Sequence, residues 1–143
     1  MTFSATPSPA EQWLDGTGGR IFTRHWEPEE TPKASLVICH GVNSHGGQYV
    51  RAAKDFADRG FAVTALDLRG RGKSDGERYY VETIDDYVAD VSLTIEYARS
   101  KHPDLPVYLL GHSAGGVTSV TYALDYQDPV SYTHLTLPTT ERV

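Results

Sequence analysis

Three short runs of apolar residues, separated by helical patterns, constrain the fold of this chain most strongly. They span Ala34–Cys39, Phe61–Leu66 and Val107–Leu110. Continuous apolar runs of this length are typical of strands that are buried on both faces of a sheet. Between them, Tyr49–Arg59 and Asp85–Lys101 carry apolar residues at helical spacing. This alternation predicts an α/β fold, in which a mostly parallel sheet has helices on both faces.

Two further segments extend the pattern at its ends. Trp13–Asp15 and Arg20–Trp26 flank a turn rich in glycine, Gly16–Gly19, and together they predict a β-hairpin. After the third apolar run, the glycine-rich turn Gly111–Gly116 leads into Val117–Tyr126, which we expect to be helical. The predicted order is therefore a hairpin followed by β-α-β-α-β-α. In such sheets the functional groups lie at the carboxyl ends of the strands.

The composition of the 143 residues fits one packed domain and argues against several classes of partner. Lys and Arg total 13 against 19 Asp and Glu, which gives a net charge of −6. Nucleic-acid binding and polybasic membrane anchoring both need a basic surface, so we expect neither. The single cysteine, Cys39, leaves no disulfide framework and no cysteine-only metal site, and it fits a reducing, cytoplasmic location. We also expect no transmembrane segment and no signal peptide.

The turn Gly111–Gly116 carries the strongest signal of chemistry. It contains the pattern Gly-x-Ser-x-Gly around Ser113, between a predicted strand and a predicted helix. A sharp strand-to-helix turn exposes the serine hydroxyl, and its strained backbone requires small neighbours such as Ala114 and Gly115. The helix that follows directs its first N–H groups toward the place where an oxyanion would form. Ser113 is therefore the candidate nucleophile. The alternative is a glycine-rich helix start with Ser113 as its N-cap.

A second turn, His40-Gly41-Val42, follows the first apolar run. In a scaffold with a serine on a strand-to-helix bend, a second oxyanion donor is expected at this place. We therefore predict that the backbone N–H groups of Val42 and Ala114 form the oxyanion hole. We interpret His40 and His45 as partners in loop hydrogen bonds rather than as metal ligands, because zinc sites need more ligands in a recognisable spacing.

The glycine-rich loop Asp67–Gly76 superficially resembles a nucleotide-binding loop. A phosphate-binding loop needs a glycine five positions before Gly72, where this chain has Asp67. A dinucleotide-binding loop fails as well, because Asp75 occupies the position of the third glycine. We interpret the loop as a structural turn, and we expect no cofactor and no metal.

A general base and an acid that could activate Ser113 are not evident. In a scaffold with this serine bend the chain order is serine, then acid, then histidine. His134 is the one histidine after Ser113, and Asp125 and Asp128 are the acids between them. Both aspartates lie on the helix that leaves the serine or just after it, so neither is expected to turn back. The catalytic relay is therefore encoded incompletely or not at all.

These motifs carry a family resemblance. Over about Trp13–Asp128 the chain resembles the N-terminal half of an α/β-hydrolase of the monoacylglycerol lipase and lysophospholipase type, a group also described as serine aminopeptidase S33-like. The resemblance rests on three segments in the same order and spacing, His40–Tyr49, Asp67–Arg78 and Pro106–Gly116. Full-length members are longer and add further strands, a cap, and the catalytic Asp and His. The resemblance therefore implies an α/β-hydrolase fold that is truncated after the helix following the nucleophile.

The same resemblance implies roles for residues and a class of substrate. It implies Ser113 as nucleophile and the N–H groups of Val42 and Ala114 as oxyanion donors. The implied partner is a small-molecule ester, a monoacylglycerol or a similar lipid, and the implied location is cytoplasmic and peripheral to a membrane. Ala114 stands where lipase relatives often carry Met, which leaves the preferred substrate open.

We expect the chain to have two parts. Residues 1–129 form the N-terminal half of the hydrolase domain, with a loose arm at residues 1–10. We interpret residues 130–143 as a non-native tail, because their sequence can be encoded by read-through of a sequencing-library adapter. The alternative is a native strand, since Val130–Leu137 is rich in β-prone residues.

The expected function is that of a serine ester hydrolase that forms an acyl-enzyme on Ser113. The chain alone is expected to be inactive, because the catalytic Asp and His are missing. Thioesterases and aminopeptidases share the same serine bend, and a non-catalytic binding module of this fold is a further alternative. Epoxide hydrolases and dehalogenases of this fold use an aspartate nucleophile, so Ser113 disfavours them.

Overall fold

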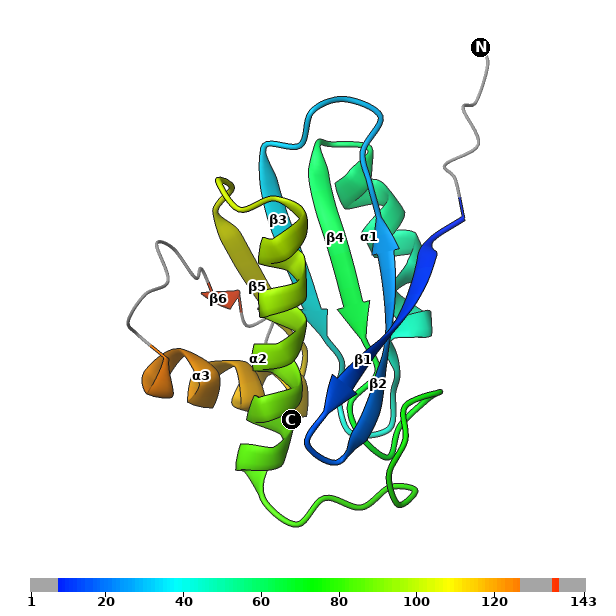
Figure 1. Cartoon of the computed structure of the whole chain (residues 1–143), viewed down its shortest axis with the longest axis vertical. Helices are drawn as coiled ribbons and strands as arrows, with labels where there is room; N and C mark the ends of the chain where they lie inside the picture. The colour runs from blue at the N-terminus through cyan, green and yellow to red at the C-terminus, as the bar shows by residue number, and fades with distance from the viewer. Residues whose placement is uncertain (1–7, 127–134, 137–143) are drawn as a thin grey trace, which may run out of the picture.

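The computed structural model describes residues 8–126 and 135–136, which form one mixed sheet flanked by helices (Figure 1). Across the described residues the strand order is β1-β2-β4-β3-β5-β6. The pairs β1–β2 and β2–β4 are antiparallel, and the other neighbours are parallel. The elements are, in chain order, β1 (Ala10–Gly16), β2 (Gly19–Trp26), β3 (Ala34–Cys39), η1 (Gly46–Tyr49), α1 (Val50–Ala57), β4 (Phe61–Leu66), α2 (Ile84–Lys101), β5 (Val107–Gly111), α3 (Ala114–Asp125) and β6 (Leu135–Thr136).

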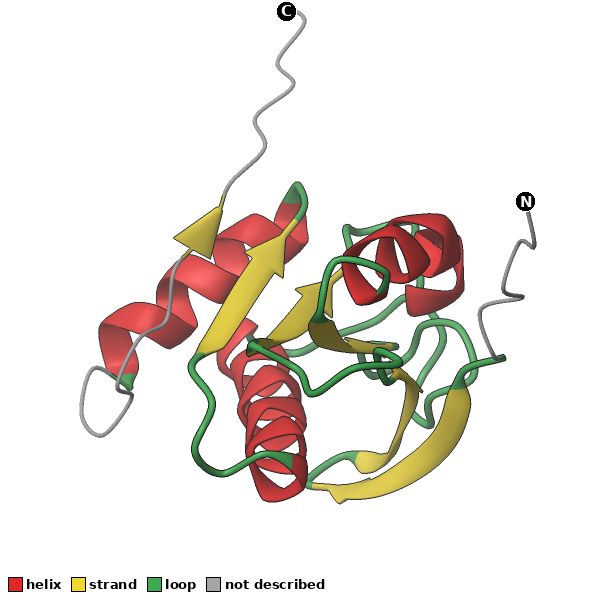
Figure 2. Cartoon of the chain, turned by 90° about the horizontal axis from the view of Figure 1, so that it is seen from above, coloured by secondary structure: helices red, strands yellow, loops and turns green. Residues whose placement is uncertain are grey.

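Apolar side chains on the two faces of the sheet form two separate cores. Leu36 and Ile38 of β3 belong to the core that includes residues of α1, and Val37 and Cys39 belong to the core beneath α2. Successive side chains of a strand point to opposite faces, so one continuous buried run supplies both cores. Figure 2 shows α1 on one side of the sheet and α2 with α3 on the other. The predicted α/β architecture with helices on both faces is confirmed.

The three apolar runs form the parallel part of the sheet, as predicted. In this register Val37 of β3 lies opposite Thr64 of β4 and Leu109 of β5. Because β3, β4 and β5 are parallel, their carboxyl ends share one edge, at the lower end of the sheet in Figure 1. The glycine-rich turns after these strands are therefore brought together at one edge. The predicted hairpin is β1 and β2, which pair antiparallel.

Helix boundaries differ from the sequence prediction, most of all at α3 and α1. Helix α3 begins at Ala114 and not at Val117, because its first turn packs directly against the backbone at the end of β3. The helix predicted over Tyr49–Arg59 is α1, which spans Val50–Ala57; Tyr49 instead ends the 3-10 helix η1 that precedes it. Gly60 follows with a φ of +94° and ends the turn, as expected of glycine.

The ends of the chain bear on the expected division into parts. Strand β1 begins at Ala10, so the last residue of the expected arm lies in the sheet. Residues 127–134 and 137–143 lie outside the described residues, and with them most of the interpreted tail and His134. Leu135–Thr136 form β6, which pairs with β5. No helix of the described residues has both the length and the apolar character that crossing a bilayer requires.

Candidate active site

Ser113 lies on the bend between β5 and α3, with its side chain exposed. Its backbone has φ 56° and ψ −119°, a conformation that few residues other than glycine adopt. Ser113 occupies the N-cap position of α3, but its side chain makes no capping hydrogen bond. The alternative interpretation is thus met in position, since Ser113 is the N-cap residue, but its hydroxyl does not cap the helix. The bend therefore holds Ser113 in a strained backbone conformation, and strained residues are frequent at functional sites.

Two glycines allow this bend to approach the sheet. A Cβ at Gly115 would lie 2.2 Å from the carbonyl oxygen of Cys39, and one at Gly111 would lie 2.5 Å from the carbonyl oxygen of Gly115. Both contacts are with backbone atoms, which cannot move aside like the end of a flexible side chain. The first turn of α3 is thus seated directly on the end of β3, and this close approach fixes where Ser113 projects.

The turn after β3 adjoins the serine bend. A Cβ at Gly41 would lie 3.3 Å from the Cβ of Ser113 and 3.2 Å from the carbonyl oxygen of His112. The N–H of His112 donates to the carbonyl oxygen of Cys39 at 3.1 Å, which ties the two turns together. The structure therefore brings the predicted residues of both turns, Ser113 with its neighbours and Gly41 with Val42, to one place.

The predicted oxyanion donors differ from the N–H groups around them. In the first turn of α3, the N–H of Gly116 donates to the carbonyl oxygen of Ser113 at 2.8 Å, and the N–H of Gly115 to that of His112 at 2.9 Å. By contrast, the N–H groups of Val42 and Ala114 reach no acceptor within the described residues. Ala114 is the first residue of α3, so its N–H lies at the positive end of the helix dipole.

His40 and His45 hold the loops in place, as predicted. The His40 ring is fully buried, with Nδ1 2.8 Å from the carbonyl oxygen of Gly41 and Nε2 2.9 Å from the backbone nitrogen of Leu68. Burial lowers the pKa of His40 below its usual value, so the ring is held neutral. Nδ1 of His45 accepts from the N–H of Gly47 and caps η1. Both rings thus have structural partners.

The loop after β4 is organised around its first residue. Asp67 is fully buried, and its carboxylate accepts from the N–H of Gly46 at 2.6 Å, from the N–H of Lys73 at 2.9 Å and from Nη1 of Arg24 at 3.0 Å. N–H groups that would face a phosphate in a nucleotide-binding loop here face a carboxylate of the protein itself. The interpretation of this loop as a structural turn agrees with these contacts.

Comparison with known proteins supplies the family. Residues 30–140 match the family described as serine aminopeptidase, S33. A monoacylglycerol lipase of Mycolicibacterium smegmatis is 36% identical over 129 residues, which are 90% of this chain and 45% of that protein. The chain belongs to the serine aminopeptidase S33 family. The monoglyceride lipase of Mus musculus is 36% identical over 112 residues, 78% of this chain and 37% of that protein. The chain spans less than half the length of these curated relatives.

Solved structures with an α/β-hydrolase fold superpose on this chain. A thermostable carboxyl esterase from Bacillus coagulans superposes with a TM-score of 0.80 at 22% identity, over 91% of this chain and 44% of that chain. A serine hydrolase without a lid from Xanthomonas campestris gives a TM-score of 0.72 at 23% identity, over 89% and 60%. At this identity the likeness shows the fold alone.

A general base for Ser113 is missing from the described part of this S33 family member. Within those residues the Ser113 hydroxyl has no hydrogen-bond partner. His112 is its neighbour in the chain, but the exposed ring packs edge-on against Tyr49 with centroids 6.4 Å apart. Asp125 ends α3, about 18 Å along the helix axis from its start. The structure therefore separates Asp125 from the serine, as the sequence predicted.

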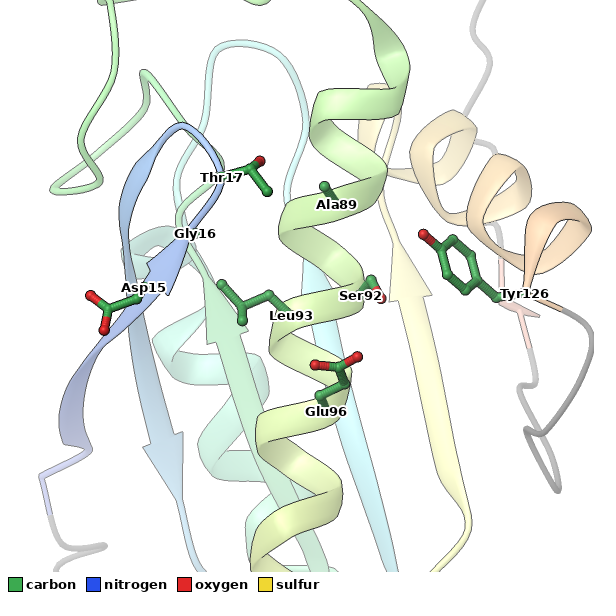
Figure 3. A pocket seen from close by; sticks show the side chains of 8 residues that line it. All are labelled: Asp15, Gly16, Thr17, Ala89, Ser92, Leu93, Glu96 and Tyr126. Atoms are coloured by element: carbon green, nitrogen blue, oxygen red, sulfur yellow. The ribbon is translucent and has the colours of Figure 1, made fainter.

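A hollow of about 200 Å³ lies away from Ser113. Figure 3 shows its lining from the β1–β2 turn, one face of α2 and the end of α3; the residues are Asp15, Gly16, Thr17, Ala89, Ser92, Leu93, Glu96 and Tyr126. Tyr126 follows the last residue of α3, whereas Ser113 precedes the first. The hollow is therefore no part of the serine site. Within the described ranges, no group of three or more His, Cys, Asp or Glu side chains is arranged to hold a metal ion.

Proposed function

We propose that Ser113 is the nucleophile of a serine ester hydrolase. One observation carries this proposal: an exposed serine at φ 56°, on a glycine-bounded bend, lies beside a turn with unused backbone donors. In the reaction, Oγ of Ser113 bonds to the ester carbonyl carbon and the alcohol leaves with a proton. Water then cleaves the acyl-enzyme, which releases the carboxylic acid and restores the hydroxyl.

The N–H groups of Val42 and Ala114 bind the oxyanion in this proposal. A tetrahedral intermediate places negative charge on the former carbonyl oxygen, and two fixed N–H donors stabilise it without reorganisation. Each such donor contributes about 10²–10³ in rate in related chemistry. The absence of protein acceptors for these two groups within the described residues supports the assignment.

The proposed substrate is a monoacylglycerol or a similar lipid ester. Curated relatives at 36% identity are named monoacylglycerol and monoglyceride lipases. Val42 is 50% exposed and Val117, in the first turn of α3, is 61% exposed, so apolar surface is available on both elements next to Ser113. Such a substrate would bring a cytoplasmic enzyme into peripheral contact with membranes. Cys39 is buried and its pKa is raised to about 12 by burial, so it is no competing nucleophile.

The chain is proposed to be the N-terminal half of a longer hydrolase. Its curated relatives are more than twice as long as the part they share with it. The base and the acid for Ser113 then belong to the unmatched part, and residues 130–143 are not native. Alone, the chain keeps at most the residual catalysis of its oxyanion donors, about 10³–10⁴ over water.

Labelling by a fluorophosphonate in the longer protein tests this proposal. The gene is first read past codon 129, and the full protein is treated with the probe and digested for mass spectrometry. We expect the adduct on the peptide that contains Ser113, together with hydrolysis of monoacylglycerol. Ser113→Ala removes both, whereas Ser100→Ala, an exposed serine on α2, changes neither. A Ser113→Ala variant that is still labelled and keeps full activity would reject the assignment of Ser113 as the nucleophile.

A further inference from the structure

A buried histidine joins two of the turns at the carboxyl edge of the sheet. His40 follows β3, and its side chain is fully buried. Nδ1 lies 2.8 Å from the carbonyl oxygen of Gly41, and Nε2 lies 2.9 Å from the backbone nitrogen of Leu68 in the turn after β4. Both ring nitrogens are thus engaged by main-chain atoms, and both contacts lie next to the serine site.

These two partners fix which ring nitrogen carries the proton. A backbone N–H can only donate, so Nε2 of His40 accepts from Leu68 and carries no proton. A carbonyl oxygen can only accept, so Nδ1 carries the proton and donates to Gly41. The ring is therefore neutral and in a single tautomer.

The hydrogen bond to Gly41 also sets the direction of a neighbouring N–H. The carbonyl of Gly41 and the N–H of Val42 belong to one peptide unit, which is planar and trans, so the two groups point in opposite directions. The N–H of Ser44 donates to the same carbonyl oxygen at 3.3 Å. With that oxygen held on the side of the His40 ring, the N–H of Val42 must point to the other side.

We propose that His40 is a positioning residue, whose Nδ1–H aims the Val42 N–H at the oxyanion site by holding the Gly41 carbonyl. This inference rests on the proposed function for its catalytic meaning, but the tautomer and the direction of the peptide do not depend on it. His40 touches no reacting atom, and it acts only through the Gly41–Val42 peptide. A protonated ring would present an N–H to the N–H of Leu68 and lose one of the two contacts that hold it.

The charges around His40 favour the neutral ring. Burial is the largest influence and lowers its pKa, with smaller contributions of the same sign from His45 and Arg71. The hydrogen bond to Gly41 and the carboxylate of Asp67 act in the opposite sense, and they are outweighed. Arg71 is itself buried, and its Nε and Nη1 atoms have no hydrogen-bond partner within the described residues. The ring is thus kept neutral by its burial and by neighbouring positive charge.

Nitrogen NMR of the chain tests the tautomer directly. With ¹⁵N-labelled histidine, we expect the His40 ring to show a protonated Nδ1 and an unprotonated Nε2, and to begin gaining a proton only below the pH at which histidine in an unfolded chain does. The Val42 amide resonance should shift in the same pH range. A protonated Nε2 at neutral pH would overturn the inference whatever the enzyme does.

Two amide variants that differ in reach by one methylene test the positioning role in the longer hydrolase. In His40→Asn the side-chain amide can donate from the position of Nδ1, whereas in His40→Gln the polar group reaches only the position of Nε2. We expect the Gln variant to lose up to about 10²-fold in kcat, as when an oxyanion donor is lost, with little change in KM. The Asn variant should keep most of kcat. Equal losses in both variants, or none in either, would reject the role.

A control separates a loss of function from a loss of folding. His25 is also buried, with Nδ1 2.7 Å from Oγ1 of Thr64 and Nε2 2.6 Å from Oε1 of Glu27, and neither partner belongs to the serine site. His25→Gln should lower thermal stability without changing kcat. If the wild-type protein itself neither hydrolyses esters nor takes the probe at Ser113, the proposed function fails, and the NMR result still decides the state of the ring.

Discussion

Two glycine-rich turns at the same edge of the sheet use their backbone donors in opposite ways. In the loop Asp67–Gly76, the buried carboxylate of Asp67 accepts a hydrogen bond from the N–H of Lys73. It accepts another from the N–H of Gly46, which follows β3 in the chain. In the bend Gly111–Gly116, the N–H of Ala114 has no acceptor within the described part of the chain. Glycine content alone therefore does not mark a binding site. In the proposed function, the mark of the site is a backbone donor for which the described residues offer no acceptor.

The two turns differ in the same way in their charged groups. The loop after β4 is held by the buried Arg24–Asp67 pair, by Arg69, which binds Asp90 of α2, and by Arg78, whose guanidinium donates to carbonyls of the loop. At the bend, no ion pair of the described residues involves a residue of Gly111–Gly116. We infer that the first turn stabilises the edge, and that the second, held by backbone hydrogen bonds and packing without ion pairs, is left open for chemistry.

Removal of the loop's central carboxylate should have the largest effect on stability. Asp67→Ala leaves the guanidinium of Arg24, whose side chain is only 10% exposed, without its partner at 3.0 Å. The loss of one member of a buried pair costs about 3–5 kcal/mol. Urea unfolding of the chain measures this loss in the free energy of unfolding.

An exposed pair provides the control for Asp67→Ala. Glu11 and Lys73 are 3.9 Å apart with both side chains 56% exposed, so Glu11→Gln should change stability by less than about 1 kcal/mol. Equal effects of the two substitutions would show that the loop is not organised by Asp67.

A side chain on the bend should have the next largest effect. In Gly115→Ala the new methyl group would lie 2.2 Å from the Cys39 carbonyl oxygen, so α3 must move away from β3. Overpacking of this kind costs about 1–3 kcal/mol, and the shift should also displace Ser113. Thermal unfolding and the rate of labelling at Ser113 measure the two consequences.

Gly60→Ala separates packing from conformational strain. Gly60 has φ +94°, but the nearest atoms to an added methyl group are 3.6 Å away on the flexible Lys33 side chain. The expected cost is about 1 kcal/mol, from backbone conformation alone. If Gly115→Ala cost no more than Gly60→Ala, the close seating of α3 on β3 would be wrong.

The smallest expected effect is the dependence of stability on pH. Burial lowers the pKa of His25 and of His40 in the folded chain, against opposing contacts with Glu27 and Gly41 respectively. The unfolded chain then binds more protons below about pH 6.5, so stability is complete above that pH and falls as the pH drops through it. Each group removes at most about 1.4 kcal/mol per pH unit. Urea unfolding between pH 5 and 8 measures the slope.

The variant His25→Gln tests the upper part of this pH range, and the carboxylate of Glu27 sets its lower limit. His25→Gln should remove about half of the slope below pH 6.5 and leave the plateau above it flat. Burial alone would raise the pKa of Glu27, but its hydrogen bonds to His25 and His102 outweigh burial and lower it. Glu27 therefore acts only near pH 4.5 and below. Stability that rises as the pH falls from 7 to 5 would contradict the account.

The strands of the fold could be predicted from the sequence more closely than its helix ends. The run Phe61–Leu66 has the same bounds in the structure, because a strand buried on both faces admits only apolar or small residues. The sequence pattern predicts the start of α3 at Val117, three residues too late, because glycines normally argue against a helix interior. Here Gly115 is needed for a tertiary contact with Cys39, which no local pattern reports.

The candidate site was predictable where it depends on local geometry. The small residues around Ser113 predict a strained bend, and the backbone of Ser113 has such a strained conformation, with φ 56°. The loop hydrogen bonds of His40 were predictable, but its proposed positioning role was not, because that role depends on Leu68, which is 28 residues away in the chain and meets the ring only through the sheet. The one signal was a histidine directly before Gly41 and Val42. The orphaned nitrogens of Arg71 could not be foreseen either, since sequence does not reveal which groups lack partners.

A crystal structure of the longer hydrolase with a phosphonate bound to Ser113 tests the central claim most directly. The adduct carries an oxygen at the place of the oxyanion. The account predicts that this oxygen lies about 2.7–3.1 Å from the backbone nitrogens of both Val42 and Ala114, with Ser113 still at positive φ. An oxygen that points away from both nitrogens, or a Ser113 that lies within a regular helix, would contradict it.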